Sequence, residues 1–239
     1  MEEHLLPFFD ERQTHVNTLM FHCSVQRTPQ MIKTLQELEL SCHYIIDLDG
    51  KVTRLVPENK RAWHAGLGSW RNNKDDMNSH SIGIELSSPS LGQETYPQKQ
   101  INSLITLSRQ IISRYAIQPQ YVIGHSDSAP TRKADPGKSF PWAYLAEHKI
   151  GLWYNLQDAT YAPTADIKTL LSSIGYDTRT PESFIASQYA FARHFIPHLI
   201  TVDPDISHLV DNVYPSQLDF SSSEEFITIA QAVYMRFQA

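Results

Sequence analysis

The feature that most constrains the fold is the alternation, over the first 150 residues, of short apolar runs with segments of helical periodicity. Runs of branched and aromatic residues bounded by polar breaks predict buried strands, and Asp49-Gly50 between two of them is typical of a hairpin turn. Thr-Pro openings followed by apolar residues at helical spacing predict helices. The predicted strands are residues 16–22, 44–48, 52–56, 81–86 and 121–124, and the predicted helices are residues 28–40 and 95–117. Together they predict an α/β fold, a mixed β-sheet flanked by helices.

After about Gly151 the strand signals stop. Residues 152–163 are predicted to be a linker, and the remainder is predicted to be helical. Thr164 is the expected cap of a helix over residues 165–174, and Thr180-Pro181 is expected to open a second over 181–196. Apolar spacing predicts a third from Phe226 to Phe237. The predicted domains are a catalytic domain over 1–151 and a small all-helical domain over 164–239.

Composition narrows the possible functions. The formal net charge of -6 disfavours nucleic acid, and no apolar run reaches the roughly 18 residues of a membrane helix. The first ten residues are acidic and lack the apolar stretch of a secretory signal, which predicts a cytoplasmic protein. The alternative is the periplasm or outer membrane if a leader has been removed.

The chain has only two cysteines, Cys23 and Cys42, so a metal site must be built mainly from its 11 histidines and its carboxylates. A chain of this size does not need a disulfide between them. His22 ends the first strong strand, His125 follows the last, and Asp135 comes ten residues later. Catalytic zinc takes three such protein ligands and keeps a fourth position for water. The spacing alone does not identify a metal site, because any histidine-rich chain contains similar spacings.

Six segments carry a more specific signal when they are taken in order. They are Met-Phe-His22-Cys-Ser, His-Tyr44-Ile-Ile-Asp, Trp63-His64-Ala-Gly, Asn78 to Glu85, Gly-His125-Ser-Asp, and Lys133-Ala-Asp135-Pro-Gly. This combination resembles the zinc N-acetylmuramoyl-L-alanine amidases of the AmpD and AmiD type, which are related to phage amidases and peptidoglycan recognition proteins. The resemblance covers residues 9–142.

The resemblance implies one zinc ion per chain, held by His22, His125 and Asp135, with Glu85 and Lys133 as the catalytic pair. It implies hydrolysis of the amide between N-acetylmuramic acid, or its 1,6-anhydro form, and L-alanine in peptidoglycan or muropeptides. The roles are chemically reasonable. Glu85 follows an apolar run where an unpaired carboxylate is costly to bury, and it could act as general base and acid. Lys133 could stabilise the oxyanion.

Four further residues are predicted to contact the substrate. Trp63 and His64 would form an aromatic and imidazole wall for a sugar and peptide, although both could equally be structural. Asn78 and Tyr44 are second-rank candidates, and a hairpin tyrosine is just as often a core residue. Three cations could meet a carboxylate of the stem peptide, and the sequence does not choose among them. They are Arg61, Arg71 and Lys74.

Two other functions use the same residues. A peptidoglycan recognition protein would have the fold without turnover, and the intact ligand set disfavours it. A zinc peptidase cutting within the stem peptide would need the same metal chemistry. The C-terminal helices resemble the peptidoglycan-binding modules of some amidases, through Leu170 to Tyr176 and Ala190 to Phe195. The alternative for them is a packing domain that binds nothing.

Overall fold

A computed structural model describes residues 1–200 and 220–238, so residues 201–219 and 239 of the predicted helical domain lie outside the described residues. The core is a six-stranded mixed sheet of order β1-β5-β4-β9-β3-β10, which confirms the predicted fold class. β4, β9, β3 and β10 run parallel, and β5 is antiparallel to β4. The strands of this sheet are β1 (Glu2–Glu3), β3 (Thr18–Ser24), β4 (Tyr44–Ile46), β5 (Val52–Arg54), β9 (Ser81–Ser87) and β10 (Val122–Gly124).

Four further strands form two small antiparallel sheets, and eight α-helices and four short 3-10 helices are found in residues 1–200 and 220–238. The small sheets pair β2 (Phe9–Glu11) with β6 (Lys60–Ala62), and β7 (Leu67–Trp70) with β8 (Asn73–Asp76). The α-helices are α1 (Thr28–Glu37), α2 (Met77–His80), α3 (Gln98–Tyr115), α4 (His125–Ser128), α5 (Trp142–Glu147), α6 (Ile167–Ile174), α7 (Pro181–Phe195) and α8 (Glu224–Gln238). Short 3-10 helices are η1 (Pro119–Tyr121), η2 (Leu156–Tyr161), η3 (Pro197–Leu199) and η5 (Phe220–Ser222).

Alternation along the central strands separates the two faces of the sheet. Phe21 and Ile84 lie in register on β3 and β9, and they share one hydrophobic cluster with Ile101, Leu104 and other residues of α3. The next residue on each strand, His22 on β3 and Glu85 on β9, points to the opposite face because successive side chains of a strand alternate. The long amphipathic helix therefore covers one face and leaves the polar residues on the other.

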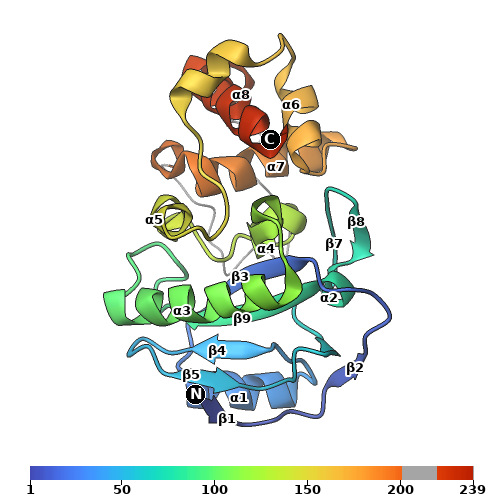
Figure 1. Cartoon of the computed structure of the whole chain (residues 1–239), viewed down its shortest axis with the longest axis vertical. Coiled ribbons are helices and arrows are strands. Elements are labelled where there is room, and N and C mark those ends of the chain that lie inside the picture. Colours follow the sequence, from blue (N-terminus) through green and yellow to red (C-terminus); the bar gives the residue numbers. More distant parts are fainter. Residues whose placement is uncertain (201–219, 239) are drawn as a thin grey trace.

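The C-terminal helices are built onto this second face. Met20 of β3 and Ile123 of β10 belong to the same buried cluster as Leu171 of α6, Phe191 of α7 and Phe226 of α8. Leu152, Trp153 and Tyr154 of the predicted linker also pack against that cluster. Figure 1 shows α6, α7 and α8 together at one end of the molecule, beyond α4 and α5, with the strands stepping away from them. One hydrophobic core thus runs across the predicted domain boundary.

Residues 66–80 lie between predicted strands and contain the β7–β8 hairpin and α2, which an apolar pattern could not indicate because β8 reads Asn-Lys-Asp-Asp. The first helix begins as predicted, and one helix cap is shifted. Thr28 is the first residue of α1, and its N–H donates to the Asp47 carboxylate, 3.3 Å away. α6 is capped by Asp166, which accepts from the N–H of Thr169, rather than by Thr164.

Neither cysteine forms a disulfide. Cys23 is buried in the cluster beneath α3, and Cys42 is buried in a separate cluster beside α1. Within residues 1–200 and 220–238, no helix has both the length and the hydropathy required to span a membrane.

Candidate active site

Strand register brings the predicted site residues into one row. His22 on β3 is paired in register with Glu85 on the adjacent parallel strand β9. On the other side of β3, Gly124 of β10 is paired with Phe21, so His125 continues the chain at the level of His22. Neighbouring strands lie about 4.8 Å apart, so side chains at the same level of adjacent strands can reach a common point. His22 is 63 positions from Glu85 and 103 positions from His125 in the sequence, and strand pairing brings the three residues together.

The three predicted ligands converge on one point. The Nδ1 atoms of His22 and His125 are 3.0 Å apart, and Oδ2 of Asp135 lies 3.0 Å from the first and 3.3 Å from the second. Two ligands of one tetrahedral zinc ion, each bound at roughly 2.0–2.2 Å, lie about 3.3 Å apart. Both histidines are buried and the Asp135 side chain is 14% exposed. The donor types, their number and their spacing fit a zinc ion.

Hydrogen bonds orient the His22 ring toward that point. The Ser81 hydroxyl donates to the Met77 carbonyl at 2.6 Å, so its oxygen accepts from His64 Nε2, 3.3 Å away. His64 Nδ1 is then the acceptor for His22 Nε2–H, at 3.0 Å. This leaves the lone pair of His22 Nδ1 facing His125 and Asp135, the tautomer that a metal ligand needs.

The His125 ring is fixed in the same way. Its Nε2 donates to the Ala65 carbonyl at 2.9 Å, which leaves the Nδ1 lone pair for the metal. The Ala65 segment is itself held by Asn78, whose Oδ1 accepts from the backbone N–H groups of His64, Ala65 and Gly66 at 3.0, 2.7 and 3.2 Å. Asn78 is 6% exposed. This placement fits a support for the loop better than the predicted substrate contact.

Gly83 leaves the space that the His64 ring occupies. A Cβ at this position would lie 2.4 Å from His64 Nδ1, far inside van der Waals contact. We expect Gly83→Ala to displace the ring and release His22, lowering zinc affinity by about 10-fold, as the loss of a ligand's hydrogen-bond partner usually does. Competition with a chromophoric chelator measures this affinity. Gly151→Ala, where a Cβ would come no nearer than 3.7 Å to another atom although the residue has a positive φ, of +76°, is the comparison variant. An unchanged zinc affinity in Gly83→Ala would contradict the assigned role of His64.

One carboxyl oxygen of the partly buried Glu85 has no hydrogen-bond partner among the described residues. This oxygen, Oε2, is itself buried. The pKa of Glu85 is raised to about 8, mainly by burial and also by the negative charge of Asp135, with Lys133 partly offsetting both. An unpaired buried carboxyl group is costly to stability, and such groups cluster at functional sites. Its position in the row beside His22 suits proton transfer at the metal site.

Asp135 and Lys133 have opposite charges at the same rim. Burial alone would raise the pKa of Asp135, but the hydrogen bonds and charges of His125 and His22 hold it well below its usual range. Burial lowers the pKa of His22 to about 4, and His125 and Lys133 contribute in the same direction. Lys133 therefore acts electrostatically on both His22 and Glu85. At pH 7 Asp135 is a carboxylate and His22 a neutral imidazole, the states in which these side chains can bind zinc.

The other predicted substrate contacts have mixed outcomes. Tyr44 is paired in register with Ile84, so it lies on the α3 face, opposite to the metal ligands, and its hydroxyl donates to Glu58 at 2.7 Å. The predicted substrate contact of Tyr44 does not fit this placement. His64 uses both ring nitrogens in the hydrogen bonds to His22 and Ser81, which fits a supporting role. Trp63 is half-buried and its indole N–H donates to Asp10 at 2.7 Å, and its predicted substrate contact stays a prediction.

Two of the three cations are already engaged. Arg61 pairs with Asp10 and Asp76, at 2.6 and 3.0 Å. Arg71 donates to the Ile174 carbonyl at 2.8 Å and its guanidinium lies over the Phe237 ring. Both therefore have structural partners. Lys74 on β8 is exposed, and its predicted meeting with a stem-peptide carboxylate stays a prediction.

A fourth histidine beside the site gives the protein an acid-sensitive stability. Gly83 N–H donates to His43 Nδ1 at 3.0 Å, and burial, together with the nearby Arg12 cation, lowers the pKa of His43 to about 3. Folded His43 thus stays neutral where the unfolded residue, with a pKa of about 6.5, takes up a proton. We expect the free energy of unfolding to fall as the pH drops from 6.5 toward 3, by up to about 1.4 kcal/mol per pH unit from this residue.

Urea unfolding of the metal-free protein at pH 7 and pH 5 measures that dependence. Wild type should lose about 2 kcal/mol more than His43→Gln over this interval, because the variant cannot take up the proton. His198→Gln, at an exposed histidine, should behave as wild type. Equal pH dependence in wild type and His43→Gln would contradict the buried neutral state of His43.

Sequence patterns missed the supporting residues of the site. Ser81 and the Ala65 carbonyl act through hydrogen bonds that no spacing encodes. Asp127 had a signal, since it stands two residues after His125 in Gly-His-Ser-Asp, but its partners Tyr176 and His194 are 49 and 67 residues away. A buried acid beside a predicted ligand is the clue that could have found it.

A mixed sheet with two histidines and an aspartate able to hold a metal ion, beside a buried glutamate, is the arrangement of a water-activating hydrolase. Residues 12–138 match the family described as N-acetylmuramoyl-L-alanine amidase. The N-acetylmuramoyl-L-alanine amidase AmiD of Escherichia coli is 35% identical over 217 residues, 80% of this chain and 78% of that protein. The 1,6-anhydro-N-acetylmuramyl-L-alanine amidase AmpD of Citrobacter freundii is 40% identical over 46% of this chain and 57% of its own length.

The similarity extends to the whole fold. The structure of Escherichia coli AmiD in complex with anhydro-N-acetylmuramic acid-L-Ala-D-gamma-Glu-L-Lys superposes with a TM-score of 0.74, at 29% identity, over 95% of this chain and 92% of that one. The chain belongs to the N-acetylmuramoyl-L-alanine amidase family.

Proposed function

We propose that this amidase is a zinc enzyme that cleaves the amide bond between 1,6-anhydro-N-acetylmuramic acid, or N-acetylmuramic acid, and L-alanine. The observation that carries the proposal is the convergence of three ligand atoms, from His22, His125 and Asp135, beside the unpaired carboxyl oxygen of Glu85. The choice of substrate is supported by the relatives, whose names specify this bond and the anhydro-muropeptide.

An amide carbonyl is a weak electrophile, and the site supplies three aids to its hydrolysis. Zinc, when bound, polarises the carbonyl and lowers the pKa of a water molecule from 15.7 to about 7. Glu85 takes the proton from the attacking water and delivers it to the nitrogen of L-alanine as the carbon–nitrogen bond breaks. A raised pKa suits it to both steps. Lys133 lies at the same rim and stabilises the negative charge that develops on the carbonyl oxygen.

Two alternatives use the same site. A recognition protein would bind the muropeptide without turnover, and a peptidase would cut within the stem peptide. The unpaired Glu85 carboxyl group favours an enzyme, because a binding protein would derive no benefit from its burial cost. The family relationship, rather than the site geometry, supports the sugar–alanine amide as the bond that is cut. The cytoplasmic location stays a prediction, and so does binding of peptidoglycan by the C-terminal helices.

Mass analysis of the products tests this function. The zinc-loaded protein is incubated with anhydro-muropeptide and, separately, with intact sacculi, and a chelator-stripped sample is the control. We expect free stem peptide that begins with L-alanine, and no release after chelation. A shortened muropeptide that keeps the sugar–alanine bond would indicate a peptidase, and binding without any product would indicate a recognition protein. A preference between the two substrates would separate muropeptide recycling from wall hydrolysis.

A further inference from the structure

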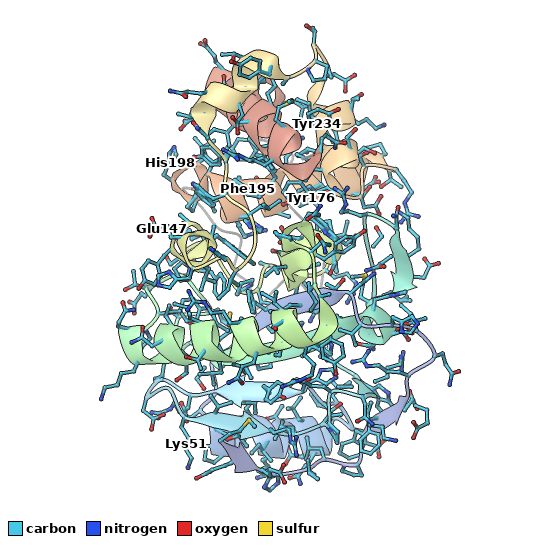
Figure 2. The ribbon with its side chains drawn as sticks, in the orientation of Figure 1. Lys51, Glu147, Tyr176, Phe195, His198 and Tyr234 are labelled. Atoms are coloured by element: carbon cyan, nitrogen blue, oxygen red, sulfur yellow. The ribbon has the colours of Figure 1, made fainter. Side chains whose placement is uncertain are left out.

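A buried acidic residue, Asp127, links the segment from Gly124 to Ser128, which contains the predicted ligand His125, to the C-terminal helices. Asp127 is 1% exposed, and its carboxylate accepts three hydrogen bonds. One comes from the Gly124 N–H within the same loop, at 2.7 Å. The others come from the Tyr176 hydroxyl, just after α6, at 2.8 Å, and from His194 Nδ1 on α7, at 2.9 Å. Figure 2 shows Tyr176 where the C-terminal helices meet α4.

The segment that Asp127 holds carries one predicted metal ligand, His125, and is hydrogen-bonded to the backbone of another, Asp135. Gly124, bonded to the Asp127 carboxylate, is followed directly by His125 in the one-turn helix α4. The next residue, Ser126, donates its N–H to the Asp135 carbonyl at 3.0 Å. Movement of Asp127 would therefore displace both His125 and Asp135. A one-turn helix has little stability of its own, so its position depends on such contacts.

The two donors are themselves held rigidly by aromatic packing. The His194 ring is stacked on Trp142 of α5, with centroids 3.8 Å apart, and Tyr176 contacts Trp70 of the β7–β8 hairpin edge-on at 5.0 Å. Tyr176 and His194 are 3% and 5% exposed. Buried rings in fixed contacts hold hydrogen-bond donors at defined positions, which is what an outer support of a metal site requires.

We infer that Asp127 is a positioning residue of the metal site and that Tyr176 and His194 make the C-terminal helices part of that site's support. The helical unit then has a second function besides any binding of the cell wall, because it sets the geometry in which His125 and Asp135 hold their ion. This inference rests on the proposed binding of zinc at these residues. It predicts that a change in the helical unit, more than 40 residues from any ligand in sequence, alters metal retention.

Tyr176→Phe is the most selective test, because it removes one hydroxyl group and keeps the ring between Trp70 and Phe191. The zinc-loaded full chain is mixed with a chromophoric chelator and the rate of zinc release is recorded. We expect release to be about fivefold faster, the effect of one lost hydrogen bond, and at least about 10-fold faster in Asp127→Asn. Tyr234→Phe on α8, which Figure 2 shows farther from α4, is the matched control and should release zinc at the wild-type rate.

Two further measurements separate positioning from simple packing. In the cobalt-substituted protein, the visible absorption bands should shift in Tyr176→Phe and Asp127→Asn but not in the control, because these bands report ligand geometry. The kcat for anhydro-muropeptide should fall while KM stays unchanged, since the substrate contacts are kept.

A lower melting temperature with wild-type zinc release and wild-type cobalt bands in Tyr176→Phe would overturn the inference, because the contact would then be packing alone. If Asp127→Asn does not fold, Tyr176→Phe decides the outcome. Failure of wild type itself to bind cobalt or zinc would instead overturn the proposed metal site. The two failures are therefore distinguishable.

Discussion

Glu85→Gln is expected to lower kcat for anhydro-muropeptide cleavage by about 10²- to 10⁴-fold, the usual contribution of a general base and acid. Glutamine keeps the size of the side chain but can neither accept a proton from water nor deliver one to the leaving nitrogen. Zinc content and KM should stay close to wild type, because Glu85 is not among the three converging ligands. Steady-state kinetics with product detection, together with metal analysis, measure all three quantities.

The control for this variant is Glu147→Gln, at an exposed glutamate on α5 that Figure 2 shows apart from the central strands. It should leave kcat unchanged. The folded state of Glu85→Gln should be at least as stable as wild type at pH 9 in the absence of metal, since a carboxyl group whose pKa is raised from 4.5 to about 8 on folding makes the wild-type fold progressively less stable as the pH rises between these values. Wild-type kcat in Glu85→Gln would remove Glu85 from the mechanism.

His125→Ala is expected to abolish zinc binding and to lower the rate of cleavage by more than about 10³-fold, because hydroxide is then no longer available near neutral pH. The thermal shift on adding zinc gives a readout that does not depend on activity. A ligand at 100 times its dissociation constant stabilises a fold by about 2.7 kcal/mol, so wild type should melt at a clearly higher temperature with zinc. His125→Ala should show no such shift.

His198→Ala, at a histidine with a side chain that is 63% exposed, is the matched control. It should keep both the thermal shift and the activity. A zinc-dependent thermal shift of wild-type size in His125→Ala would mean that the ion binds elsewhere.

The candidate site residues could be predicted from the sequence because their motifs resemble a known family, and because the predicted strands place His22 at a strand end and His125 directly after another strand. In the structure, His22 and Glu85 are each the fifth residue of a seven-residue strand, and parallel pairing in register places them side by side. That pairing and its register could not be predicted, because strand length and alternation do not say which strands are neighbours.

The roles of Tyr44 and His64 could not be predicted, because they depend on which face a side chain occupies and on what fills the space beside it. Tyr44 and Ile45 are neighbours on β4 and point to opposite faces of the sheet. The register with β9 decides which of the two shares the face of Glu85, and it is Ile45. His64 lies where Gly83 has no Cβ, a relation between two residues that are 19 positions apart. The β7–β8 hairpin escaped prediction because β8 is polar and pairs only with β7.

The contacts of Asp127 show a further limit. A pattern can mark a buried acid after a histidine, but it does not reveal that the donors come from the C-terminal helices. Strand signals before residue 151 and only helical signals after it predict two domains. The shared core becomes visible only in the structure, where Met20 and Phe191 lie in one cluster. Apolar residues that face each other across a predicted boundary look the same in sequence as residues of two independent cores.

The most direct test of the account is a zinc titration of the metal-stripped wild-type chain, with release of L-alanine-terminated stem peptide from anhydro-muropeptide as the signal. Activity should be absent at the start, rise linearly with added zinc, and reach a plateau at one zinc ion per chain. Full release of stem peptide by the stripped protein, or a plateau only at two ions per chain, would contradict a single zinc site formed by His22, His125 and Asp135.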